Sequence, residues 1–293
     1  MQIRTDLAVE AREYVREGAE QIHGVSVQEY YVPETEIHIT KVVIETKNGA
    51  KIIGKPMGTY ITLDAPDMMD PDDNYHAEVS HEIAKHIKAL LPMKKKEQSF
   101  LVVGLGNRDV TADSLGPRSV DNLMITRHIV EKFGAAAYAR DKVNKVSAII
   151  PGVMARTGME TAEIVKGVVE QTSPDVILAI DALAARSTKR LNRTIQISNA
   201  GIHPGSGVGN HRNALDETTL GIPVIAIGIP TVVDAGTIVK DALDKNGAGK
   251  IIKEAFPIAD LNNFYVTGKD IDEIVKRLSF TVSEALNEAF EII

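Results

Sequence analysis

Short apolar runs alternate with helical segments over the second two-thirds of the chain, and this alternation constrains the fold more than any other feature. The runs cover residues 100–105, 146–153 and 175–181, and they continue in the strings TIQIS and IPVIAIGIP. Strands that are apolar on both faces are typical of a parallel sheet with helices packed on each side. The pattern therefore predicts an α/β fold with a central, mostly parallel sheet flanked by helices.

Several segments have the periodicity of amphipathic helices. The predicted helices cover residues 7–21, 74–91, 117–133, 159–171 and 269–293. The sequence contains no internal repeat, low-complexity tract or long linker. All 293 residues, 1–293, are therefore expected to form a single domain.

The N-terminal third alternates β-branched and polar residues and predicts short strands. These strands are expected at residues 36–46, 50–55 and 59–64, and the dipeptide Asn48-Gly49 is a hairpin signal between the first two. We expect small N-terminal β-hairpins that decorate the main sheet.

Composition excludes several classes of function. The net charge of −7 and the 4% aromatic content disfavour direct nucleic-acid binding, which depends on Lys, Arg and aromatic side chains. No apolar run approaches the roughly 18 residues that a membrane-spanning helix needs. The absence of Cys excludes disulfides and thiolate chemistry, and it fits a reducing compartment. We expect a soluble, cytoplasmic protein with no nucleic-acid or membrane partner.

The loop VVGLGNRDVTADSLGPRS follows the first apolar run of the α/β region. Gly104 and Gly106 suggest a dinucleotide fingerprint, but Asp109 occupies the third glycine position of that motif. The glycines are better explained by a tight turn after the strand, and no cofactor is expected. Asp113 precedes Gly116-Pro117, so it is either the N-cap of a helix or a carboxylate presented at the edge of the sheet.

Asp181 ends the apolar run VILAID and is followed by residues that favour a helix. It too could be a helix cap. In an open parallel sheet, however, function gathers in the loops at the carboxyl ends of the strands, where both Asp113 and Asp181 are expected. Two close carboxylates share a proton, and such a pair can activate a water molecule and polarise a carbonyl group. The two aspartates are the candidate catalytic pair.

A glycine-rich loop lies farther along the chain. Glycine lets a backbone come close to a ligand or to a substrate chain, so this loop is a candidate substrate-binding segment. The candidate residues are Gly201, His203, Gly205, Gly207 and Gly209. A solvent-exposed role for His203 stays open beside a catalytic or ligand role.

Other catalytic motifs are absent from the sequence. His81-Glu82 does not continue into H-E-x-x-H because residue 85 is Lys, and no G-x-S-x-G elbow occurs. No metal ligand is therefore assigned, although two aspartates with a histidine could hold a divalent ion. The carboxylates are the best candidates for chemistry.

Several long strings, in order along the chain, resemble the germination proteases of spore-forming bacteria. They are RTDLAVEA, VVGLGNRDVTADSLGPRSVDNLMITRHI, IIPGVMARTGMET, AIDALAARS and GIHPGSGVGN with TLGIPVIAIGIPTVVDA. The resemblance implies a single α/β peptidase domain, similar in fold to hydrogenase maturation proteases. It also implies an atypical aspartic endopeptidase in which Asp113 and Asp181 are catalytic.

The resemblance further implies the biological setting. Its substrates would be small acid-soluble spore proteins, degraded during germination in the spore core by a homotetramer made in the forespore. The family is made as a zymogen that removes its own N-terminal segment. TDLAVEA matches the expected cleavage sequence, so self-cleavage is predicted between Asp6 and Leu7, with residues 1–6 as a short pro-segment.

Two alternatives stay open. One is a metal-dependent, maturation-type peptidase that acts on a metalloenzyme precursor. The other is a non-catalytic α/β module that binds a small ligand, in which Asp113 and Asp181 would be ordinary helix caps.

Overall fold

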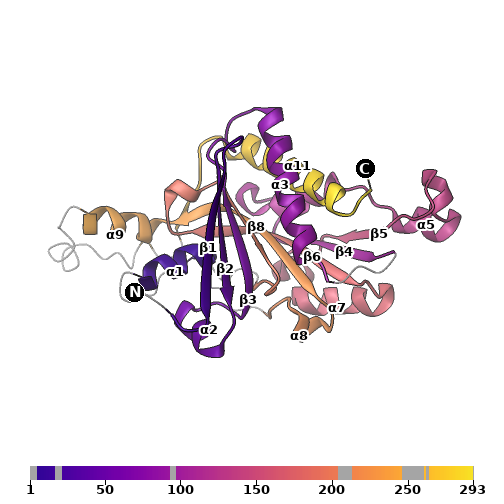
Figure 1. Cartoon of the computed structure of the whole chain (residues 1–293), viewed down its shortest axis with the longest axis horizontal. Helices are drawn as coiled ribbons and strands as arrows, with labels where there is room; N and C mark the ends of the chain where they lie inside the picture. The colour runs from indigo at the N-terminus through magenta and orange to yellow at the C-terminus, as the bar shows by residue number, and fades with distance from the viewer. Residues whose placement is uncertain are drawn as a thin grey trace.

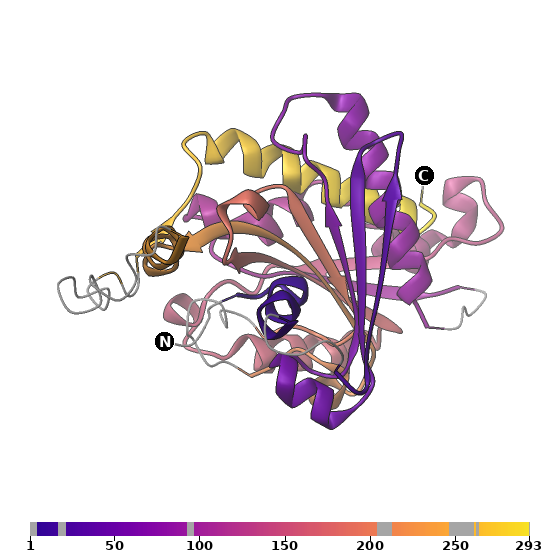
Figure 2. The same cartoon turned by 60° about the vertical axis from the view of Figure 1, so that its left-hand side comes forward.

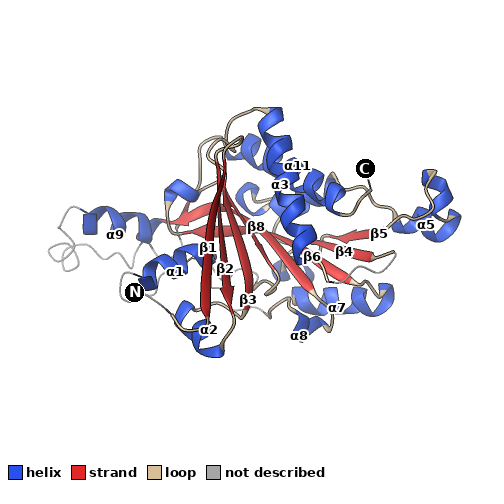
Figure 3. Cartoon of the chain, in the orientation of Figure 1, coloured by secondary structure: helices blue, strands red, loops and turns tan. Residues whose placement is uncertain are grey.

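The computed structural model describes residues 5–16, 22–92, 97–203, 213–245, 261 and 264–292. Its centre is one nine-stranded sheet, drawn in red in Figure 3. The strands are β1 (Val25–Val32), β2 (Ile37–Ile44), β3 (Gly58–Asp64), β4 (Ser99–Gly104), β5 (Lys145–Ile149), β6 (Val176–Ala185), β7 (Thr194–Ser198), β8 (Val224–Asp234) and β9 (Tyr265–Val266). Their order is β1-β2-β3-β7-β8-β6-β4-β5, with β9 paired to β8.

The α/β class is confirmed, but the prediction of a mostly parallel sheet is wrong. Three strand pairings are parallel, namely β4 with β5, β4 with β6, and β6 with β8. The five other pairings between the described strands are antiparallel. All five residues of β7 are buried. A fully buried antiparallel strand has the same continuous apolar pattern as a central parallel strand, so the pattern does not reveal the direction of β7. The predicted similarity to hydrogenase maturation proteases stays a prediction.

Helices cover both faces of the sheet (Figure 1). They are α1 (Ala8–Arg16), α2 (Lys47–Ile53), α3 (Asp73–Leu90), α4 (Leu115–Asp121), α5 (Arg127–Phe133), α6 (Met154–Thr157), α7 (Thr161–Thr172), α8 (Glu217–Leu220), α9 (Ala235–Lys245) and α11 (Ile271–Ala289). On one face, α3 and α11 pack together over the largest core cluster. On the other face lie α1, α7 and α8, as Figure 2 also shows.

The N-terminal hairpin differs from the prediction. Residues 50–55 are not a strand, because Lys47–Ile53 forms helix α2. Thr46 caps this helix by accepting a hydrogen bond from the Gly49 amide, and Gly54 ends it in the left-handed conformation. The hairpin instead joins β1, which the sequence pattern missed, to β2. Because β1 is an exposed edge strand, it lacks the apolar alternation that marks a half-buried strand.

One other predicted element also changes. The helix predicted over residues 117–133 is divided into α4 and α5, whereas the long C-terminal helix is confirmed as α11. Among the described residues, no helix has the length and hydropathy that crossing a bilayer requires.

Candidate functional site

Asp113 ends a short 3-10 turn, η1 (Thr111–Asp113), in the loop after β4. Its carboxylate accepts a hydrogen bond from the amide of Asn107 at 2.8 Å, and its carbonyl oxygen lies 3.0 Å from the same nitrogen. Ser114, not Asp113, is the N-cap residue of α4. The interpretation of Asp113 as a helix cap is therefore wrong. Its carboxylate instead holds the loop between residues 107 and 113 closed through the Asn107 amide.

Glycines let this loop lie directly against the strands. Gly106 has a φ of +111°, and a Cβ atom there would lie 2.1 Å from the carbonyl oxygen of Asp113. A Cβ on Gly116 would lie 2.4 Å from the carbonyl oxygen of Leu105 and 2.6 Å from that of Ile180. The tight-turn explanation of the glycines is confirmed at Gly106, because only glycine fits this approach without strain.

Asp181 lies inside β6 and is 6% exposed. Its Oδ1 atom accepts a hydrogen bond from the amide of Ala182 at 2.9 Å. The helix expected after Asp181 does not form, since the strand continues to Ala185. A helix cap is therefore excluded, and Asp181 is a buried carboxylate within a central strand.

The fold brings the elements that hold the two aspartates into contact. Turn η1 packs against both β6 and β8. On the β8 side, the hydroxyl of Thr231 donates to the carbonyl oxygen of Ala112 at 2.5 Å. On the β6 side, the amide of Leu105 donates to Ile180, the residue before Asp181, at 2.8 Å. Asp113 and Asp181 are thus on adjacent elements, although Asp181 lies within β6 and not at the carboxyl end of a strand, where it was expected. Their role as a catalytic pair stays a prediction.

The glycine-rich segment lies partly outside the described residues, which exclude Gly205, Gly207 and Gly209. Gly201 has a φ of +76°, and a Cβ there would lie 2.4 Å from the carbonyl oxygen of Leu215. The next residue, Ile202, forms an isolated antiparallel bridge with Leu215. His203 follows and is exposed. A substrate-binding role for this loop stays a prediction.

The predicted self-cleavage site is docked on β6. The amide of Asp6 donates to the carbonyl oxygen of Ala184, and the amide of Ala184 donates to the Asp6 carboxylate, both at 2.9 Å. Leu7 is completely buried against Leu183 and Val233. Because side chains alternate along a strand, Leu183 and Asp181 point to the same face of the sheet. The candidate bond therefore lies on the face that the candidate catalytic aspartate occupies.

Sequence reasoning missed two residues that hold this segment. The amide group of Gln196 accepts from the backbone of Ala8 at 2.7 Å and donates to the carbonyl oxygen of Asp6 at 3.2 Å. A glutamine inside the buried strand TIQIS was a signal for a polar contact. Lys55 donates to the carbonyl oxygen of Thr5 at 3.1 Å, and nothing in its local sequence indicated this.

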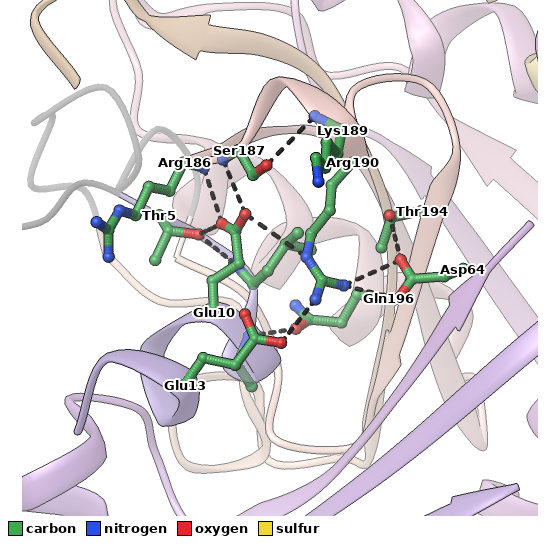
Figure 4. A network of polar contacts seen from close by, with 12 residues as sticks. Thr5, Glu10, Glu13, Asp64, Arg186, Ser187, Lys189, Arg190, Thr194 and Gln196 are labelled. Carbon is green, nitrogen blue, oxygen red and sulfur yellow. Dashed lines mark hydrogen bonds and ion pairs between the residues drawn. The ribbon is translucent and has the colours of Figure 1, made fainter. Parts of the chain in front are cut away.

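Among the described residues 5–16, Glu10 is the most enclosed charged residue, at 3% exposure. Figure 4 shows it among its polar partners. Its carboxylate accepts hydrogen bonds from the amides of Arg186 at 2.8 Å and Ser187 at 2.9 Å, and from the Thr5 hydroxyl. The guanidinium of Arg190 lies 3.7 Å away. Arg190 is held in place by Asp64, to which it donates at 2.7 and 3.0 Å.

We expect the Glu10→Ala substitution to lower the free energy of unfolding by about 3 kcal/mol. It leaves the amides of Arg186 and Ser187 buried without their acceptor, and it removes one charge from a buried ion-pair network. The matched control is Glu13→Ala, because Glu13 also pairs with Arg190 but has a side chain that is 52% exposed. The control should cost less than about 1 kcal/mol in urea unfolding. Equal losses in the two variants would contradict the prediction.

Lys55 is expected to make the stability depend on pH. Burial lowers the pKa of its amine from the ordinary 10.5, and the carboxylates of Asp6 and Glu10 offset part of that shift. Between the lowered pKa and 10.5, the unfolded chain binds more protons than the folded chain, so the free energy of unfolding rises with pH. The Lys55→Met variant should lack this rise. Urea unfolding of both proteins between about pH 7 and about pH 10 tests it, and parallel curves would refute it.

Potential metal ligands do not cluster in the part of the chain that the structure describes. No group of three or more His, Asp or Glu residues there is arranged to hold an ion.

Comparison with known proteins identifies the family. A model of the germination protease family matches residues 3–254. The chain belongs to the germination protease family. A germination protease of Clostridium perfringens is 43% identical, with 99% of this chain and 95% of that protein covered. One of Caldanaerobacter subterraneus is 44% identical, with 99% and 94% covered. One of Priestia megaterium is 48% identical over 83% of this chain and 66% of that protein.

Germination proteases are peptidases, so the chain is a hydrolase of peptide bonds. The family match includes the docked segment from Thr5 onward, the turn with Asp113 and the strand with Asp181. Helix α11 lies beyond the matched residues, although the relatives from Clostridium and Caldanaerobacter match nearly the whole chain.

Proposed function

We propose that the chain is an endopeptidase that begins the degradation of small acid-soluble spore proteins during germination, with Asp113 and Asp181 as its catalytic pair. The observation that supports this most is the position of Asp181, a buried carboxylate inside β6 with turn η1 packed against the same strand. Neither aspartate is the N-cap residue of a helix, so helix capping explains neither of them. Membership in the germination protease family supports the choice of substrate class.

In the proposed mechanism the two carboxylates share one proton and hold a water molecule. The ionised member removes a proton from the water as it attacks the peptide carbonyl. The protonated member donates a hydrogen bond to the carbonyl oxygen as the carbon becomes tetrahedral. The proton taken from the water then passes to the peptide nitrogen as the C–N bond breaks. A buried setting favours such sharing because two close negative charges are costly at low polarity.

The chain is further proposed to be made as a zymogen that cuts its own Asp6–Leu7 bond. The docked segment supports this, because Asp6 occupies both backbone groups of Ala184, three residues beyond Asp181 on the same strand. Three residues of a strand span about 10 Å. The bond is thus held close to the proposed catalytic pair but displaced along β6, as an uncleaved precursor requires.

Incubation of the purified chain with a small acid-soluble spore protein tests the proposal. Mass spectrometry of the products should locate cuts after acidic residues that precede apolar ones, and the enzyme itself should acquire a new N-terminus at Leu7. An intact substrate would refute the proposed activity. Loss of cleavage in the presence of a chelator, restored by a divalent metal, would favour the metal-dependent alternative. Sedimentation of the same sample tests the proposed homotetramer.

A further inference from the structure

One hydroxyl group joins the backbone nitrogen of Leu7 to the carboxylate of Glu10. Thr5 Oγ1 accepts a hydrogen bond from the Leu7 amide at 3.1 Å, and its own hydrogen is donated to Glu10 Oε2. Both ends of this chain of contacts are buried, with Leu7 at 0% and Glu10 at 3% exposure. Thr5, which links them, lies on the N-terminal side of the Asp6–Leu7 bond.

Hydrolysis of that bond changes the charge at this position. Water adds across the C–N bond, Asp6 gains an α-carboxylate, and the nitrogen of Leu7 takes up the released proton. The resulting α-ammonium has an ordinary pKa of about 7.7–8.0, so it is charged at neutral pH. A buried ammonium is costly unless it is paired. Its place at the start of α1 is also unfavourable, since the N-terminal end of a helix has partial positive charge.

We propose that Glu10 is the binding site for the α-ammonium of Leu7 that self-cleavage creates. The inference rests on the proposed cleavage at Asp6–Leu7. When the preceding residues leave, the Thr5 hydroxyl leaves with them, and the ammonium takes its place beside Glu10 Oε2. An indirect contact through a hydroxyl becomes a direct, buried ion pair.

Two of the groups that position Glu10 do not belong to the departing residues. The amides of Arg186 and Ser187 continue to donate to its two oxygens. Glu10 therefore does not have to move when the bond is cut.

Among the described residues, two other cations face Glu10, and neither takes the place of the ammonium. Arg190 approaches at 3.7 Å, but Asp64 and Glu13 bind its terminal nitrogens at 2.7 and 2.8 Å. Lys55 lies near Glu10 and donates to the Thr5 carbonyl, so it loses that acceptor when the segment leaves. Burial already disfavours the charged form of Lys55, which reduces its competition with the new ammonium.

Departure of the residues before Leu7 also exposes an edge of β6. The strand β4 pairs with β6 only as far as Ile180, and Asp6 occupies the N–H and C=O of Ala184 beyond that point. Departure of Asp6 releases both groups for an extended peptide, while the ion pair at Glu10 keeps α1 docked beside the edge. Backbone groups on such an edge are a common means of holding a peptide.

The reactivity of the Leu7 amine in the processed chain tests the inference. The probe is acetic anhydride, with mass spectrometry of the N-terminal peptide at a series of pH values. We expect the amine to react at least about tenfold more slowly than the amine of the free peptide LAVEA near neutral pH, which corresponds to a pKa raised by one unit or more. Glu10→Gln should abolish most of the protection, whereas the matched variant Glu13→Gln should keep it. Reaction at the rate of the free peptide would overturn the inference.

Protection that persists in Glu10→Gln would also overturn it, because burial alone would then explain the slow reaction. If that variant does not fold, the pH profile of the unmodified processed chain decides, since pairing requires a midpoint above about 8 and burial alone gives a lower one. A chain that never acquires the Leu7 terminus would contradict the proposed self-cleavage, not the ammonium site. The site is then tested on the chain released by a site-specific protease from a fusion that ends just before Leu7.

Discussion

Replacing Asp181 by Asn is expected to lower the rate of spore-protein cleavage by about 10²- to 10⁴-fold, the range that general acid–base catalysis contributes. An amide cannot hold or release the shared proton at any working pH. Asn keeps the size of the side chain, and its oxygen can still accept the hydrogen bond from Ala182. The fold should therefore survive. Initial rates of substrate cleavage measure the loss of activity, and far-ultraviolet circular dichroism on the same samples measures whether the fold is kept.

The matched control for this experiment is Asp72→Asn. Asp72 caps α3 by accepting from the amides of Asn74 and Tyr75, and Asn caps a helix about as well as Asp. The control makes the same chemical change at a structural aspartate, and its activity should stay within about twofold of the original, as a surface change near neutral in stability implies. If Asp181→Asn were as active as the control, the catalytic pair would be wrong, whatever its effect on stability.

The end of β6 shows where the sequence was insufficient. The apolar run up to Asp181 correctly located the strand, but Ala182, Leu183 and the alanines after it favour a helix by intrinsic propensity. In the fold these residues pair with β8, and Leu183, Ala184 and Ala185 are buried, so tertiary packing overrides propensity. The strand therefore continues past Asp181. Its carboxylate projects from the middle of a strand instead of ending one.

The docked N-terminal segment shows a second limit. Its string of residues was sufficient to locate Asp6 and Leu7 as a candidate bond, yet it said nothing of what holds them. The partners Gln196 and Arg190 lie more than 170 residues away along the chain. Contacts between residues so far apart in the sequence produce no local periodicity. The polar residue Gln196 in a buried strand was the one sequence feature that indicated them.

The loop after β4 was predicted better, because glycine has a direct structural meaning. Rejection of a dinucleotide fingerprint left the tight turn as the explanation for Gly104 and Gly106. The structure adds the reason for Gly104: a Cβ there would lie 2.5 Å from the carbonyl oxygen of Gly116. The sequence did not reveal which backbone atoms each glycine approaches.

Replacing Gly106 by Ala is expected to reduce peptidase activity nearly as much as the loss of a catalytic aspartate. The new Cβ would lie 2.1 Å from the carbonyl oxygen of Asp113 and 3.0 Å from its Oδ1. Something must shift, and the nearest atoms belong to the backbone that positions the carboxylate. A displacement of about 1 Å at a catalytic group can cost about 10²-fold in rate. The rate of substrate cleavage by the folded variant measures the effect.

Gly134→Ala separates this displacement from the general cost of placing alanine at positive φ. Gly134 has a φ of +74°, and a Cβ there would meet nothing within 4 Å. Its substitution should cost about 1–3 kcal/mol of stability, because a φ of +74° with a ψ of 178° is a conformation that essentially only glycine adopts, and it should leave activity unchanged. Gly106→Ala should cost more than that and should also lower activity. Equal stability losses with full activity in both variants would mean that the turn adjusts without moving Asp113, and that the position of this carboxylate does not limit the reaction.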